Sequence, residues 1–208
     1  KHKMNLKIST NSPFTIDNLS LSITGSKSET NRLLLLQALF PNITLANTSN
    51  SDDSEVMGAA LATNNQQPTT NNEIIDIHHA GTAMRFLTAY FAVNAGREVV
   101  LTGSSRMQER PIKILVEALE QLGAVITYEK EEGYPPIRIK GQKITASKVK
   151  LAANVSSQYI SALLLVASKL ENGLELTLEG EITSIPYIKM TLALLNDLNI
   201  QTSFEGNA

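Results

Sequence analysis

The hydrophobic positions of this chain fall into six stretches of helical character, separated by short runs typical of β-strands. The predicted helices cover residues 27–40, 53–63, 81–95, 111–122, 157–170 and 186–199. The predicted strands cover residues 73–77, 98–102, 124–129, 137–140, 148–151 and 174–179. Residues that commonly end a helix, among them Pro41, Gly96 and Gly123, follow several of the helical stretches. This alternation of strands and helices predicts an α/β protein.

Three of the helical stretches are apolar nearly all the way round, at residues 33–40, 83–93 and 160–167. Helices of this kind are typically buried on every side, whereas a helix that covers a sheet keeps one polar face. We therefore predict an inverted arrangement, with helices in the core and strands on the outside. Taken in pairs, the six helices are compatible with three strand–helix–strand–helix units.

The start of the first helix carries the strongest chemical signal, because Lys27, Ser28 and Arg32 directly precede a run of leucines. A helix N-terminus exposes unpaired backbone N–H groups and the positive end of the peptide dipole, so it attracts anions. The segment is not a P-loop, since Ser26 precedes the lysine and Leu21 stands where the first glycine belongs. It predicts a phosphate or carboxylate site; the alternative is a capped core helix whose cations are merely solvated.

Polar residues also open the third and fourth helices. Gly81 would let a ligand approach the backbone of the third helix closely. Pro111 fits the first position of the fourth helix, which would put Arg110 at its cap, free to grip a carboxylate through two parallel hydrogen bonds. The alternative for this arginine is a surface ion pair with Glu109 or Glu117.

The fifth and sixth helices begin with hydroxyl and amide side chains. Ser156, Ser157 and Gln158 open the fifth, and Ser184 and Tyr187 open the sixth. One serine suffices to cap a helix, so the additional polar groups exceed what capping requires. Five polar helix starts in one chain form a more specific pattern than any one of them alone.

Two other polar pairs have simpler interpretations. Asp52 and Asp53 open the second helix, where we expect them mainly to cap it and to compensate its dipole. The adjacent residues His78 and His79 would point apart, and no third ligand is evident, so no metal is expected.

Composition narrows the class of protein further. The chain has 208 residues, 42% hydrophobic and 18% charged, which is globular composition, and its net charge of −2 argues against a nucleic-acid-binding surface. The absence of cysteine excludes disulfides, thiolate zinc sites and cysteine nucleophiles. No apolar run approaches the roughly 18 residues that span a bilayer, and no secretory signal is visible, so a cytoplasmic location without membrane contact is expected.

The motifs SKSETNR, AGTAMR, RMQERPI, SSQYISALLL and SIPYIKMT, taken in order, resemble those of the enolpyruvyl transferases, in particular the 5-enolpyruvylshikimate-3-phosphate synthase family. The resemblance runs from about Gly25 to Asn199. It implies an inside-out α/β domain with three βαβαββ units, buried parallel helices and sheets outside. The implied reaction moves the carboxyvinyl group of phosphoenolpyruvate to the 5-hydroxyl of shikimate 3-phosphate, releasing phosphate, without metal or organic cofactor.

The resemblance also implies a role for each polar helix start. Lys27 would be the catalytic residue and would contact both substrates. The residues implied for shikimate 3-phosphate are Lys27, Ser28, Arg32, Ser156, Ser157, Gln158, Ser184 and Tyr187. Those implied for phosphoenolpyruvate are Lys27, Gly81, Arg110 and Gln158. Gly81 would also leave room for the inhibitor glyphosate.

The chain departs from the family pattern in detail and in length. His79, Phe86 and Ile185 stand where asparagine, proline and lysine are common. Family members are about twice as long, and the other half would supply the acidic proton acceptor and further cations for phosphoenolpyruvate. We therefore expect residues 1–22 to pair with that C-terminal domain, and residues 23–208 to form a shikimate-3-phosphate-binding domain that is inactive alone.

Two alternatives remain at this point. The related UDP-N-acetylglucosamine enolpyruvyl transferases share the fold and the donor, but usually have Lys-Asn where this chain has Lys27 and Ser28. A non-catalytic module that senses a phosphorylated metabolite would use the same helix starts.

Overall fold

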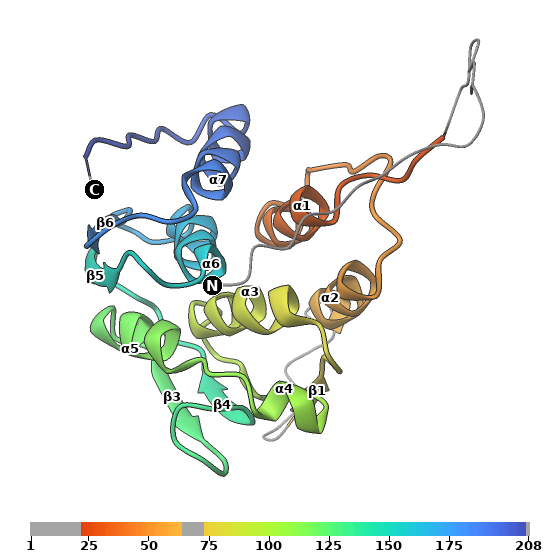
Figure 1. Cartoon of the computed structure of the whole chain (residues 1–208), viewed down its shortest axis with the longest axis vertical. Helices are drawn as coiled ribbons and strands as arrows, with labels where there is room; N and C mark the ends of the chain where they lie inside the picture. The colour runs from red at the N-terminus through yellow and green to blue at the C-terminus, as the bar shows by residue number, and fades with distance from the viewer. Residues whose placement is uncertain (1–21, 64–72, 207–208) are drawn as a thin grey trace, which may run out of the picture.

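The computed structural model describes residues 22–63 and 73–206, and its elements follow the predicted order (Figure 1). The helices are α1 (Lys27–Leu39), α2 (Asp52–Ala62), α3 (Gly81–Ala92), α4 (Ser105–Gln108), α5 (Lys113–Gln121), α6 (Ser157–Ala167) and α7 (Ile185–Asp197). The strands are β1 (Glu73–Asp76), β2 (Glu98–Thr102), β3 (Val125–Tyr128), β4 (Ile137–Lys140), β5 (Lys148–Ala152) and β6 (Glu175–Glu179). The predicted N-terminal segment 1–22, apart from Ser22, lies outside the described residues, as do residues 64–72.

Helix α3 forms the centre of the core, because every one of its residues is buried. It packs against α1, α2, α5 and α6 and against strands β2 and β4. The prediction of a helix buried on all sides is confirmed for α3 and nearly so for α6. It is wrong for α1, which buries Leu35 and Leu36 but leaves Leu33 and Leu34 only half-buried.

The strands form two sheets, with β5 and β6 at the left of the view in Figure 1 and the larger sheet towards the bottom. The larger sheet has the order β1–β2–β4–β3, in which β1 and β2 are parallel and β4 runs antiparallel to both β2 and β3. With its helices it reads β1–α3–β2–α5–β3–β4, one βαβαββ unit. The smaller sheet pairs β5 and β6 in parallel, and α6 connects them.

The segment β5–α6–β6–α7 has the same order of elements as β1–α3–β2–α5. The second helices, α5 and α7, also end with the same pattern of hydrogen bonds. The carbonyl of Leu119 in α5 accepts from the amides three and five residues later, and the carbonyl of Leu195 in α7 does the same. The residue between the two donors has a left-handed backbone in both cases, Gly123 with φ 99° and Asn199 with φ 60°. Both helices therefore end in the same way, with a residue of left-handed backbone just beyond the last turn.

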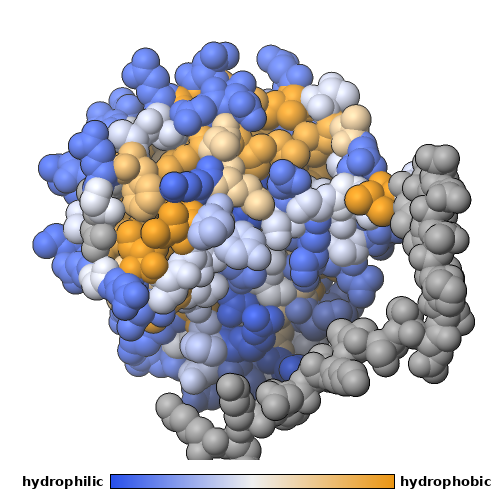
Figure 2. Space-filling model, turned by 45° about the horizontal axis from the view of Figure 1, so that its top comes forward, coloured by the Kyte–Doolittle hydropathy of each residue, from blue (hydrophilic) through white to orange (hydrophobic). Residues whose placement is uncertain are grey.

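The surface mixes apolar and charged side chains. Figure 2 shows orange, apolar residues gathered on part of one face, with blue, hydrophilic residues around them. Large hydrophobic side chains with substantial exposure include Ile23, Ile74 and Tyr187. Within the described residues, none of the helices has the length and apolar character required to cross a membrane.

Candidate functional site

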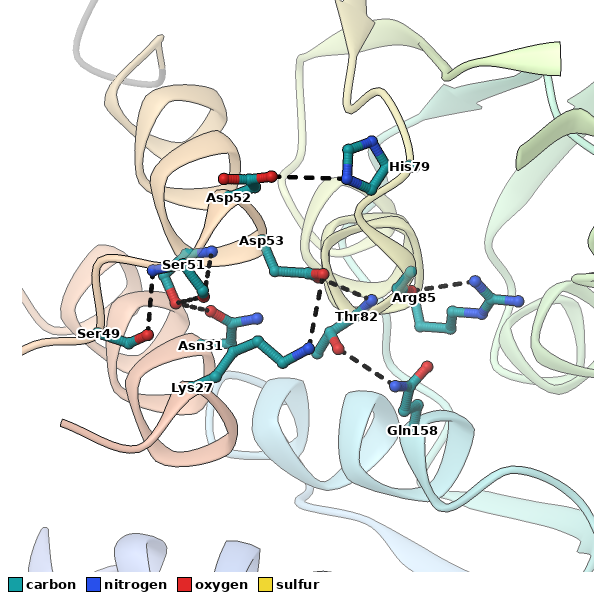
Figure 3. Close-up of polar contacts among 12 residues, drawn as sticks. Lys27, Asn31, Ser49, Ser51, Asp52, Asp53, His79, Thr82, Arg85 and Gln158 are labelled. Atoms are coloured by element: carbon teal, nitrogen blue, oxygen red, sulfur yellow. Dashed lines mark hydrogen bonds and ion pairs between the residues drawn. The ribbon is translucent and has the colours of Figure 1, made fainter. Parts of the chain in front are cut away.

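The first turns of four helices meet through a chain of polar contacts (Figure 3). Lys27, at the start of α1, places Nζ 3.8 Å from Oδ2 of Asp53 in the first turn of α2. The other oxygen of Asp53 accepts from the backbone N–H of Thr82 in α3 at 3.1 Å. The Thr82 hydroxyl accepts from the side-chain amide of Gln158 in α6 at 3.1 Å. Helices α1, α2, α3 and α6 therefore begin at one common end of the domain.

Arg32 links three helices one turn further in. Its Nε donates to the hydroxyl of Thr191 in α7 and its Nη2 to the hydroxyl of Ser161 in α6, both at 2.8 Å. Its Nη1 donates to the carbonyl of Ser28 in α1 at 2.7 Å. Because each contact lies in the first or second turn of its helix, Arg32 holds α1, α6 and α7 in parallel register.

The environment of Arg32 is unusual for a cation, since it is 3% exposed and forms no ion pair within residues 22–63 and 73–206. The rings of Phe86 and Tyr187 lie 5.5 and 6.0 Å from its guanidinium carbon. Burial lowers the pKa of Arg32 to about 10, although Tyr187 and Glu29 act in the opposite direction. The side chain is therefore still charged at neutral pH, and this positive charge lies close to the starts of α1, α6 and α7.

Gly81 and Arg110, separated by the length of α3 and β2, are brought into contact. A Cβ atom built on Gly81 would lie 2.5 Å from Nη1 of Arg110 and 3.0 Å from its Cζ. Only glycine leaves room for the guanidinium at this distance from the start of α3. The two residues expected to hold phosphoenolpyruvate thus lie side by side.

The predicted position of Arg110 within its helix is wrong. Helix α5 begins only at Lys113, with Ile112 as its N-cap, so Pro111 precedes the cap instead of occupying the first helical position. The short helix α4, which was not predicted, takes up the preceding residues. Arg110 lies in the exposed connection and, within the described part of the chain, forms no ion pair with Glu109 or Glu117.

The serines at the other helix starts differ in how they are used. Ser156 is the N-cap of α6, and its hydroxyl accepts from the backbone N–H of Gln158 at 3.3 Å. Ser157 follows it as the first helical residue and is half-buried. Ser184 is the N-cap of α7, but its side chain makes no capping hydrogen bond. Tyr187, one turn on, is 45% exposed.

Several contributors were not singled out from the sequence. Asp53 was expected to serve its own helix, but Ser51 caps α2 and Asp53 instead accepts from the first turn of α3. Ser161 and Thr191, which hold Arg32, were also missed. Their signal was present, because each is a polar residue four positions after a predicted site residue, inside an otherwise apolar helix.

The paired histidines do point apart. The Nδ1 atom of His78 lies 3.8 Å from Asp76, whereas Nε2 of His79 lies 3.6 Å from Asp52 (Figure 3). Among the residues that the structure describes, no three His, Cys, Asp or Glu side chains gather as metal ligands.

Comparison with known proteins identifies the family of the chain. The model of the family "EPSP synthase (3-phosphoshikimate 1-carboxyvinyltransferase)" matches residues 18–207. The chain belongs to the EPSP synthase family. A 3-phosphoshikimate 1-carboxyvinyltransferase of Bacteroides fragilis is 50% identical over 189 residues, which is 90% of this chain and 44% of the relative. One from Haemophilus influenzae is 40% identical over 207 residues, covering 88% of this chain and 47% of the relative.

Solved structures support the fold. An EPSP synthase from Acinetobacter baumannii superimposes with a TM-score of 0.70 at 20% identity, over 90% of this chain and 45% of that protein. This likeness confirms the inside-out α/β class expected of the EPSP synthase family. The chain spans about half the length of the curated relatives that it matches.

Proposed function

We propose that this chain is the shikimate-3-phosphate-binding half of a 3-phosphoshikimate 1-carboxyvinyltransferase. The complete enzyme would transfer the carboxyvinyl group of phosphoenolpyruvate to the 5-hydroxyl of shikimate 3-phosphate and release phosphate, a step towards chorismate and the aromatic amino acids. The observation that carries the proposal is the meeting of four helix starts around Lys27, Asp53, Thr82 and Gln158. A cytoplasmic location is part of the same proposal.

The charge of this region suits two anionic substrates. Helix N-termini attract anions through their free N–H groups and dipoles. Lys27 is half-exposed, Arg110 is exposed, and Arg32 adds a buried positive charge without a carboxylate partner in the described residues. Donors fixed in a partly desolvated site replace water around both anions and hold them together for reaction.

The substrates are assigned to two sides of the site. Shikimate 3-phosphate would lie across the starts of α1, α6 and α7. The residues assigned to it are Lys27, Ser28, Arg32, Ser156, Ser157, Gln158, Ser184 and Tyr187. Because Arg32 already donates three hydrogen bonds inside the protein, we assign it the electrostatic and positioning part of this set. Phosphoenolpyruvate would lie at the start of α3, on Gly81 and Arg110, with Lys27 and Gln158 between the two substrates.

The remaining catalytic groups are assigned to the C-terminal half of the enzyme. That half would provide the acidic proton acceptor and further cations, so this chain alone would bind but would not turn over. No metal or organic cofactor is part of the proposal. Membership of the EPSP synthase family argues against the UDP-N-acetylglucosamine alternative.

A calorimetric titration of the chain with shikimate 3-phosphate tests the proposal. Lys27→Ala and Ser157→Ala should each weaken binding, the lysine variant by roughly 10- to 100-fold because it loses a charged hydrogen bond worth about 1.5–3 kcal/mol. Lys143→Ala, at an exposed lysine paired with Glu171 and far along the sequence from the helix starts, serves as the control and should leave the affinity unchanged.

Two results would overturn parts of the proposal. A folded chain that does not bind shikimate 3-phosphate would refute the binding assignment. Phosphate release by the pure chain supplied with both substrates would refute the assignment of catalysis to the other half.

A further inference from the structure

Arg85 is a second buried arginine, and none of the roles described above uses it. It lies on α3 one turn after Gly81 and is 4% exposed. It forms no ion pair with any residue that the structure describes. Burying a cation without a carboxylate partner disfavours the folded state. The unfavourable burial of this charge suggests that Arg85 has a function besides packing in the core.

The hydrogen bonds of Arg85 enclose the segment that carries Arg110. Its Nη1 donates to the carbonyl of Gly81 at 3.0 Å, and its Nη2 donates to the carbonyl of Pro111 at 3.3 Å. The same Nη1 lies 3.8 Å from the sulfur of Met107, whose carbonyl accepts from the Arg110 amide at 3.0 Å. Arg85 therefore touches the backbone of Gly81 and the chain on both sides of Arg110.

Tyr159 reinforces this arrangement from α6. Its hydroxyl donates to the same Pro111 carbonyl at 2.7 Å, and its ring lies 5.9 Å from the guanidinium carbon of Arg85. The carbonyl next to Arg110 is thus held from two helices, α3 and α6. Tyr159 directly follows Gln158, so the same turn of α6 contributes to both sides of the site.

The electrostatics point in the same direction as the contacts. Burial is the main cause that lowers the pKa of Arg85; Tyr159 and Asp53 oppose this shift, whereas the positive charge of Arg110 adds to it. The Nε–H of Arg85 is buried and has no hydrogen-bond partner. An anion bound beside Arg85 and Arg110 would favour the charged form of Arg85.

We propose that Arg85 is the positioning residue for the phosphoenolpyruvate side of the site. It fixes the Pro111 carbonyl relative to Gly81, so that the Arg110 guanidinium stays over the start of α3, and it adds a positive charge beneath the ligand. The occupant is a small anion with carboxylate and phosphate groups. The identity of that anion rests on the proposed function. The positioning of Arg110 by Arg85 does not depend on it.

The test uses three variants and a control. Arg85→Lys keeps the charge, but the compact ammonium group of lysine cannot reach the carbonyls of Gly81 and Pro111 at the same time. Tyr159→Phe removes one donor from Pro111 and leaves Arg85 intact, so it answers the question even if Arg85→Lys folds poorly. Arg106→Lys, at an exposed arginine of α4, is the matched control.

The first measurement needs no ligand. Nuclear Overhauser contacts between Gly81 and the Arg110 side chain should be present in the unmodified chain and in Arg106→Lys. They should weaken or disappear in Arg85→Lys and in Tyr159→Phe. Retention of these contacts in a folded Arg85→Lys variant would overturn the inference, whatever Tyr159→Phe shows.

The second measurement is a calorimetric titration with phosphoenolpyruvate in the presence of saturating shikimate 3-phosphate. Arg85→Lys and Tyr159→Phe should weaken phosphoenolpyruvate binding by about 5- to 10-fold, the effect of losing a hydrogen bond of about 1 kcal/mol. The affinity for shikimate 3-phosphate alone should stay within about twofold, since those contacts lie on other helices. Equal weakening for both ligands would indicate general damage and overturn the positioning role.

A double-mutant cycle separates positioning from direct contact. In an Arg110→Met background, Arg85→Lys should cause little further loss of phosphoenolpyruvate affinity, because the residue that it positions is gone. Additive losses would overturn the inference. If the unmodified chain shows the Gly81–Arg110 contacts but does not bind phosphoenolpyruvate, the proposed function fails while the positioning stands.

Discussion

Replacing Gly81 by alanine should have opposite effects on stability and on ligand binding. Gly81 lies at the start of α3 without a left-handed backbone, so alanine fits the backbone there. Substituting alanine for glycine at a compatible position stabilises a protein by about 0.4–1 kcal/mol, mainly by restricting the unfolded chain. We expect the free energy of unfolding to rise slightly or to stay unchanged.

Ligand binding should fall because of the contact with Arg110. The added Cβ would lie 2.5 Å from Nη1, and ordinary contact begins at 3.4 Å, so the guanidinium must withdraw by about 0.9 Å. Arg110 is exposed and moves at little cost to the fold. A charged hydrogen bond lost through that displacement is worth about 1.5–3 kcal/mol, which weakens phosphoenolpyruvate binding roughly 10- to 100-fold.

Urea denaturation and calorimetric titration with phosphoenolpyruvate, at saturating shikimate 3-phosphate, measure the two effects on the same samples. Gly58→Ala is the matched control, since Gly58 lies inside α2 and a Cβ there would meet nothing within 4 Å. It should gain up to about 1 kcal/mol of stability without any change in affinity. The reasoning is refuted if Gly81→Ala binds phosphoenolpyruvate as tightly as the unmodified chain, or if it is clearly destabilised.

Four further substitutions, at three residues, test the electrostatics and the packing around the site. Arg32→Met removes a buried charge together with its hydrogen bonds and should change the free energy of unfolding by no more than about 1–2 kcal/mol. Arg32→Lys keeps the charge but loses at least one hydrogen bond, so it should lower the free energy of unfolding by about 2–4 kcal/mol. Urea denaturation in which the lysine variant is the more stable would contradict this prediction. Asp53→Asn keeps an acceptor for the Thr82 amide but removes the negative charge beside Lys27, so inorganic phosphate should bind about two- to fivefold more tightly in a calorimetric titration. Phe86→Leu should lower the free energy of unfolding in urea by about 1–3 kcal/mol, because the fully buried ring packs in the core and lies 5.5 Å from the Arg32 guanidinium; no loss of stability would show that this ring contact is unimportant.

The elements of the fold were predictable because their signals are local. Helix α3 is apolar nearly all the way round, and a helix with that pattern is typically buried in the interior. Strands β2 and β4 match their predicted bounds, since each is a short β-type run between turn residues. The short helix α4 escaped prediction because four residues carry no periodicity, and its one local signal is the cap at Ser104.

The contacts within the site depend on residues far apart in the sequence, and these could not be predicted. Arg32 reaches Ser161 and Thr191, which lie 129 and 159 positions away. A local pattern identifies a polar residue at a helix start, but the packing of neighbouring helices decides whether that residue faces a ligand or another side chain. For the same reason Asp53, which fits its own helix as a cap, serves α3 instead.

The arginines near the helix starts differ in pairing from two arginines at the larger sheet. Arg97 pairs with Glu73, and Arg138 pairs with Glu98 and Glu129. At the helix starts, within the described residues, Arg32, Arg85 and Arg110 have no such partner, and Lys27 approaches Asp53 only to 3.8 Å. A chain of net charge −2 has enough carboxylates to neutralise these cations. Leaving them unpaired costs stability and places positive charge where four helix dipoles also converge, which favours anionic over neutral ligands.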